Sequence, residues 1–256
     1  MNQYFNSVRF GRLLRKHVAE HLASYAVSLA ALFGIAVLVL SGANYMMTGS
    51  FQETEQAAFF TLLLLAAGAF FTSTIFRPLG QVRQAADFLT LPASHLEKYL
   101  VAWLLAGPLF VMFYIPLFYA ADWLVLQVSA TPNEPVQHLF NLFANKPVVT
   151  NWLLLAYPLV HGLALYGSIF FHRAQFVKTV GISFVGLVLL FVANKQAAAA
   201  ILGVKLYQAI PFGAAIIDKG ILNLPDTRLP WLPAVPLALA MLLWAAAYAR
   251  LTEKQL

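Results

Sequence analysis

The amino-acid sequence predicts an all-α polytopic membrane protein with six transmembrane helices. Of its 256 residues, 61% are hydrophobic and 10% are charged, whereas soluble domains are roughly 45–50% apolar and about 25% charged. A helix needs roughly 20 apolar residues to cross the hydrocarbon core of a bilayer. The charged residues leave six stretches without Asp, Glu, Lys or Arg, at 21–52, 56–76, 99–121, 147–172, 179–194 and 229–249.

Five of these stretches have the required length. The stretch 179–194 is shorter, but it reaches that length if the helix begins near Phe176 and Lys178 extends its ammonium group to the interface. We therefore expect one transmembrane domain covering 1–256, with spans at about 22–45, 57–76, 94–121, 152–171, 176–193 and 231–249. The short connection between the fourth and fifth spans predicts an antiparallel hairpin.

The basic residues predict that both termini are cytoplasmic. Eleven of the sixteen Lys and Arg residues then lie inside, and the first outside loop has none, as the positive-inside rule expects. The net charge of +6 needs no nucleic-acid partner, because cations beside anionic lipid explain it. The predicted location is the bacterial cytoplasmic (inner) membrane.

Residues 1–20 predict an amphipathic helix before the first span, either lying on the cytoplasmic leaflet or docking a cytoplasmic partner. The alternative is a basic flank that happens to be helical. The two arcs of the helical wheel separate by polarity. The basic arc holds Arg9, Arg12, Arg15 and Lys16, and the apolar arc holds Phe10, Leu13, Leu14 and Val18.

Two capping boxes predict where the second and third helices begin. Ser50 with Glu53, and Ser94 with Glu97, both match the pattern in which an N-cap hydroxyl and an acid three residues later satisfy each other's backbone N–H groups. The third span contains Gly107–Pro108 and Pro116, which predict kinks. Asp122 follows this span, and we expect it at the outer interface.

Residues 77–93 predict a structured cytoplasmic elbow between the second and third spans. Pro78 and Gly80 interrupt the second span, Gln81 to Leu91 can form a short helix, and Pro92 ends it.

The segment 196–228 is expected to be a helical re-entrant or interfacial segment on the outer side. A seventh span there would place Lys205 near mid-bilayer, at a cost of roughly 2.5–3.5 kcal/mol.

No catalytic or cofactor motif is present in the chain. There is no GxxxxGK[ST], GxGxxG, HExxH or GxSxG string and no Cys, so we expect no enzyme activity, no cofactor and no metal site. His161 is the ionisable side chain that lies well inside a predicted span. It is either a proton or substrate contact on a transport path, as in an ion-coupled carrier, or a neutral imidazole bonded to a neighbouring helix.

The segment Phe88–Lys98, FLTLPASHLEK, resembles the loop between the second and third spans of ABC-2-type ABC transporter permeases. The layout of a basic amphipathic helix and six spans is also similar. The resemblance implies a coupling helix at Gln81–Leu91, a connecting helix around Phe10–Lys16, a separate P-loop ATPase subunit and a second permease subunit in a homo- or heterodimer. The implied coupling positions are Arg83, Gln84, Asp87, Phe88, Thr90, Leu91, Pro92, Ser94 and Glu97.

Two functions therefore follow from the sequence. The first is the membrane-spanning permease subunit of an ATP-driven exporter, which borrows ATP hydrolysis from its partner. The alternative is a non-transport membrane scaffold or assembly protein that anchors a cytoplasmic partner.

Overall fold

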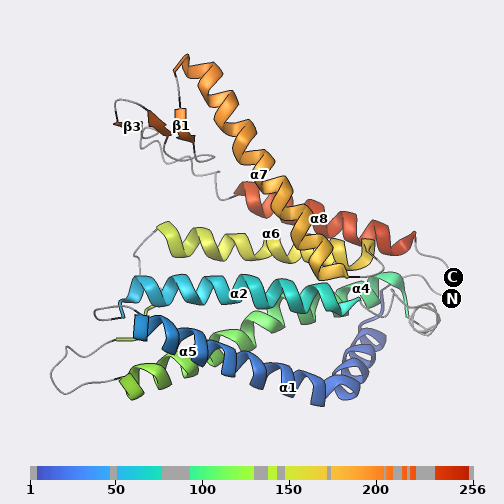
Figure 1. Ribbon diagram of the computed structural model, residues 1–256. Coiled ribbons are helices and arrows are strands. Elements are labelled where there is room, and N and C mark those ends of the chain that lie inside the picture. The colour runs from blue at the N-terminus through green and yellow to red at the C-terminus, as the bar shows by residue number, and fades with distance from the viewer. Residues whose placement is uncertain are drawn as a thin grey trace.

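The computed structural model consists almost entirely of helices, as the predicted all-α class requires (Figure 1). It describes residues 5–46, 51–76, 93–129, 138–142, 148–171, 174–204, 206–209, 215–217, 220–222 and 234–253. The helices are α1 Ser7–Met46, α2 Glu53–Ile75, α4 His95–Leu104, the π-helical turn η2 Leu105–Leu109, α5 Phe110–Ser129, α6 Val148–Phe170, α7 Gln175–Leu202 and α8 Ala234–Thr252.

Five helical segments of the described chain are long and apolar enough to cross a membrane. They are α1, α2, the continuous run from α4 to α5, α7 and α8; in α6 the apolar run is the shorter Leu155–Phe170. Large apolar side chains are exposed along these segments, among them Leu38, Leu62 and Leu242. A soluble protein rarely exposes so much apolar surface, whereas lipid tails solvate it. The fold is therefore suited to a multi-pass membrane protein.

The bundle has two distinct ends, with most helices side by side and α7 leaning away (Figure 1). We call the end where α1 and α4 begin and α8 ends the terminal end, and the other the opposite end. The N-terminal helix and the first span, predicted as separate, form one continuous helix, α1. Figure 1 shows α1 bending near the terminal end, and we call its residues 7–20 the N-terminal arm.

The start of α2 differs from the predicted Ser50–Glu53 capping box. The N-cap is Gln52, whose backbone N–H donates to the Glu55 side chain at 2.9 Å. The predicted pair Ser50–Glu53 and the observed pair Gln52–Glu55 both place an acid three residues after the N-cap, because Glu53 and Glu55 both lie in the first turn of the helix. The predicted N-cap was therefore wrong by two residues, while the predicted helix was correct.

A π-helical turn interrupts the third long segment where Gly107–Pro108 predicts a kink. Pro108 has no backbone N–H, so the regular hydrogen-bond ladder cannot continue through it. The Tyr157 hydroxyl of α6 donates to the Ala106 carbonyl at 2.8 Å. A side chain from a neighbouring helix thus satisfies a carbonyl in the irregular turn.

Within the predicted helical segment 196–228, the described residues beyond Leu202 include strands and no helix. Helix α7 continues to Leu202 through four consecutive alanines and ends at Gly203, which adopts a left-handed φ of 64°. Three short antiparallel strands follow in the order β1 Leu206–Ala209, β2 Ala215–Ile217 and β3 Gly220–Leu222. The Asn194 side-chain amide donates to the Ala209 carbonyl at 3.1 Å and ties this sheet to α7.

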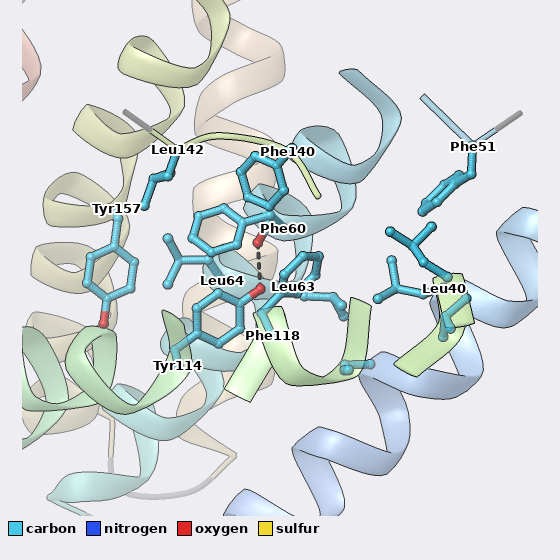
Figure 2. Close-up of a cluster of buried hydrophobic side chains, with 14 of the residues drawn as sticks. Leu40, Phe51, Phe60, Leu63, Leu64, Tyr114, Phe118, Phe140, Leu142 and Tyr157 are labelled. Atoms are coloured by element: carbon cyan, nitrogen blue, oxygen red, sulfur yellow. Dashed lines mark hydrogen bonds between the residues drawn. The ribbon is translucent and has the colours of Figure 1, made fainter. Parts of the chain in front are cut away.

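The larger hydrophobic core lies toward the opposite end, between α1, α2 and α5 (Figure 2). Aromatic rings from α2, α5 and the segment 138–142 meet there: the ring centroid of Phe60 lies 5.1 Å from that of Phe118 and 5.3 Å from that of Phe140. The Tyr114 hydroxyl donates to the Phe60 carbonyl at 2.6 Å. A smaller core at the terminal end includes Phe76, Tyr99, Leu165, Ile169, Ala247 and Leu251.

The buried side chain of Gln56 holds the segment 138–142 against the opposite end of α2. Its amide nitrogen donates to the carbonyls of Phe51 and His138, both at 3.1 Å, and its oxygen accepts from the Phe140 N–H at 2.9 Å. The Tyr119 hydroxyl donates to the Phe140 carbonyl at 3.0 Å from the other side. Segment 138–142 is therefore an ordered cover over α2 and α5.

We expect Gln56→Leu to destabilise the protein by about 2–4 kcal/mol, because each unpaired buried polar group costs about 1–3 kcal/mol. Unfolding of the purified protein in detergent measures the change. The control is Gln127→Leu, at an exposed position of α5, which should change stability by less than about 0.5 kcal/mol. Equal effects of the two variants would contradict the role of Gln56.

Gly167 allows α6 and α7 to pack closely, as the predicted hairpin requires. A Cβ at Gly167 would collide with the Thr179 side chain, which donates a hydrogen bond to the Gln175 carbonyl at 2.7 Å and is therefore held in place. We expect Gly167→Ala to be destabilising, since overpacking costs about 1–3 kcal/mol and exceeds the roughly 0.5–1 kcal/mol by which Ala favours a helix.

Gly181→Ala is the matched control for this close approach, because nothing lies within 4 Å of a Cβ at Gly181. It should be neutral or stabilising in the same unfolding measurement. A Gly167→Ala protein as stable as the Gly181→Ala protein would show that the two helices do not pack this closely.

Candidate functional site

The carboxylate of Glu97 forms a buried junction between the N-terminal arm and the start of α4. Its side chain is 0% exposed. Arg9 Nε lies 3.0 Å from Oε1 and 2.9 Å from Oε2, and Arg9 Nη2 lies 2.7 Å from Oε1. The backbone N–H groups of Asn6 and Ser94 each donate to the same carboxylate at 2.9 Å. We call these four residues the Glu97 junction.

The local sequence explains how both halves of the junction form. Ser94 has the extended backbone of an N-cap, and its hydroxyl accepts from the Glu97 N–H at 3.2 Å, which confirms the predicted capping box. On the other side, the Asn6 side chain accepts from the N–H groups of Val8 and Arg9 at 3.0 and 3.2 Å and caps α1. Two helix starts are therefore joined through one carboxylate.

The buried Glu97 carboxylate needs the positive charge of Arg9 to offset the cost of its burial. Burying a carboxylate charge is costly unless the group is paired and hydrogen-bonded. Arg9 supplies a bidentate, charge-assisted contact that is stronger than a neutral hydrogen bond. The arginine side chain is partly exposed, at 29%. Loss of Arg9 would leave the Glu97 charge buried with backbone donors as its remaining partners in the described structure.

The other basic residues of the arm lie outside the junction. Arg12, Arg15 and Lys16 are exposed, while the half-buried positions of the arm recur at helical spacing. Lys16 Nζ lies 3.8 Å from a Glu20 carboxylate oxygen, and both side chains are more than half exposed. Such a pair contributes little to stability, so this face keeps its positive charge available to lipid or a partner.

Most of the predicted coupling positions lie outside the described residues. The structure brings Ser94 and Glu97 together with Arg9 at the point where the chain leaves the elbow. The positions outside the described ranges are Arg83, Gln84, Asp87, Phe88, Thr90, Leu91 and Pro92.

His161 is buried and links α6 to α8. Its Nδ1 accepts from the indole N–H of Trp244 at 3.0 Å, which places the proton of the neutral ring on Nε2. That Nε2 is buried without a hydrogen-bond partner in the described part of the chain, and a Cβ at Gly107 would lie 3.3 Å from it. The contact with Trp244 matches the interhelical role; a place on a transport path stays a prediction.

Asp122 is buried, and not at the interface as its sequence position suggests. Its side chain is fully buried in α5, and neither carboxylate oxygen has a hydrogen-bond partner among the described residues. The prediction was wrong because α5 continues to Ser129, and its residues Val125 and Leu126 extend the core beyond Asp122 together with Phe140 and Leu142.

Several polar residues of the structure were missed by the sequence reasoning. Gln56 and Tyr157 each donate to a backbone carbonyl far from their own position in the chain. Asn6 caps α1 with its side chain, and its backbone N–H donates to the distant Glu97 carboxylate. Asn6 could have been found as an N-cap preceding the helical periodicity. Gln56 and Tyr157 carry no such signal, because their partners are carbonyls on other segments.

The described residues contain no group of three or more His, Asp or Glu side chains that could hold a metal ion.

We expect Arg9→Gln and Glu97→Gln each to lower the thermal unfolding midpoint of the purified protein, with Arg9→Gln the more damaging because it leaves a buried charge unpaired. The double variant should lose less than the sum of the two single losses. Glu253→Gln, which removes an exposed pair with Arg250, is the control and should leave the midpoint nearly unchanged. Additive losses in the double variant would contradict the junction.

Comparisons of the chain with protein-family models, with curated proteins and with solved structures find no match.

Proposed function

We propose that this chain is the membrane-spanning permease subunit of an ATP-driven ABC transporter of the ABC-2 type. The observation that carries the proposal is the Glu97 junction, which ties the N-terminal arm to the first turn of α4 directly after the elbow 77–93. Because Phe88–Lys98 resembles the coupling loop of such permeases, we assign the elbow as the contact with the ATPase.

The junction supports this function for a mechanical reason. A soluble subunit can move transmembrane helices only if the element that it pushes is stiffly attached to them. Helix α4 begins with a satisfied capping box and is locked to α1 by a buried ion pair, so force applied at the elbow reaches two long helices together. A loosely attached loop would absorb the motion.

The proposal includes a topology and a location. The chain crosses the bacterial cytoplasmic membrane six times with both termini inside, so the basic arm faces anionic lipid and the ATPase. The terminal end of the bundle, where α1 and α4 begin and α8 ends, is then the cytoplasmic end (Figure 1). Transport runs outward, through a dimer of permease subunits that alternates its access.

ATP hydrolysis belongs to the partner in this mechanism. The chain has no phosphate-binding loop, so its contribution is to receive motion at the elbow and convert it into movement of helices. The π-helical turn Leu105–Leu109 begins eight residues after Glu97 and is the irregular point nearest the junction at which the third long segment can bend.

The test is purification of the tagged full-length chain from the membranes of its own host. A P-loop ATPase should copurify and hydrolyse ATP, and Asp87→Arg should reduce its recovery at least about fivefold by reversing a charge on the elbow, about 1 kcal/mol of contact energy. Glu53→Arg, a charge reversal at the start of α2 at the opposite end of the bundle, should leave recovery unchanged.

A second readout addresses coupling. The chain has no Cys, so a single cysteine at Leu139 reports on the opposite end by its maleimide labelling rate. ATP should change this rate in the complex, and Glu97→Gln should abolish the change while the ATPase remains bound. Full recovery of the ATPase with Asp87→Arg would refute the elbow assignment, and a copurifying partner without nucleotidase activity would establish the scaffold instead.

A further inference from the structure

A small cavity lies at the terminal end, where the N-terminal arm meets the end of α2 and the start of α4. Its volume is about 70 Å³, several times the roughly 10–15 Å³ that admits one water molecule. Lys16 of the arm and Lys98 of α4 line it from two sides. The cavity is separate from the Glu97 junction, whose residues do not line it.

The walls of the cavity combine positive charge with an apolar floor. Lys98 is only 3% exposed and is one of the residues that line the cavity. Leu13, Phe76 and Val101 supply apolar surface. The acid in the lining is Glu20, which is exposed and 3.8 Å from Lys16, and a pair in that setting is weak enough to rearrange around an incoming anion.

The position of the cavity along the helices matches the depth of lipid headgroups. Its charged lining residues stand immediately outside the charge-free stretches: Glu20 precedes 21–52 and Lys98 precedes 99–121, while Phe76 is the last residue of 56–76. The same level of all three helices is therefore the boundary between polar and apolar surroundings. Lysines at such a boundary attract anionic lipids.

We propose that this cavity binds the anionic headgroup of a phospholipid, with its phosphate between Lys16 and Lys98 and its acyl chains leaving along the apolar wall. An isolated anion would contact the lysines and leave that apolar wall unused, so the combined lining selects a lipid over a free phosphate. The proposal does not depend on an ATPase partner. A bound lipid would fill the angle between the arm and the bundle, next to the elbow.

Native mass spectrometry of the full-length chain in detergent tests this proposal. The protein is mixed with phosphatidylglycerol, with phosphatidylcholine or with inorganic phosphate, and the retained adducts are counted. Phosphatidylglycerol should be retained at least about fivefold more than phosphatidylcholine, with one lipid lost last as the collision energy rises. Lys98→Met should remove this last lipid, and Lys16→Gln should reduce its retention at least about threefold.

Two further variants distinguish lipid binding in the cavity from attraction by the overall positive charge and from loss of binding through misfolding. Arg12→Gln removes an exposed charge of the same arm outside the cavity and should retain the lipid as the unaltered chain does. Ala102→Leu keeps both lysines but fills the lining, and should also expel the lipid from a folded protein. Equal retention of the two lipids, retention of phosphate in place of lipid, or full retention by both Lys16→Gln and Ala102→Leu would overturn the proposal.

Discussion

The arrangement of this bundle depends on one constraint: a polar side chain among apolar helices must find its partner on another segment. Tyr99, Tyr114 and Tyr157 each donate to a backbone carbonyl of a different helix, and Gln56 joins α2 to the cover segment 138–142. Interhelical hydrogen bonds of this kind contribute roughly 0.6–2 kcal/mol each in membranes. Because they are directional, they determine which faces of the helices meet, which apolar contact by itself does not.

The two buried carboxylates at the two ends of the bundle differ in how they meet this constraint. At the terminal end the Glu97 carboxylate is buried and accepts from four nitrogen atoms at two helix starts. At the opposite end, Asp122 is buried without a hydrogen-bond partner in the described structure. The first arrangement is a finished structural link. The second is a buried acidic group without such partners among the described residues, so the two carboxylates are not equivalent.

Sequence patterns predict the helices of this fold well and their junctions poorly. Charge-free stretches located the long apolar helices, and the Ser94 capping box located the start of α4, because hydrophobicity and capping are local properties. The strands after Gly203, the burial of Asp122 and the Arg9–Glu97 pair all depend on residues far apart in the chain. The coupling positions in the elbow rest on a resemblance, and of that group the described structure contains Ser94 and Glu97.

Helix α7 differs from the other helices because it is attached mainly near its ends. Gln175 donates to the Ser168 carbonyl at 2.8 Å near one end, Asn194 reaches the sheet near the other, and the large apolar side chains between Val180 and Val192 are exposed. Lipid is a liquid and conforms to any apolar shape. The residues of this stretch must therefore be apolar, but their exact shapes matter little because they do not pack against protein. Exchanges among Leu, Ile, Val and Phe there leave the packing of the described bundle almost unchanged, whereas any side chain at Gly167 collides with Thr179 of α7.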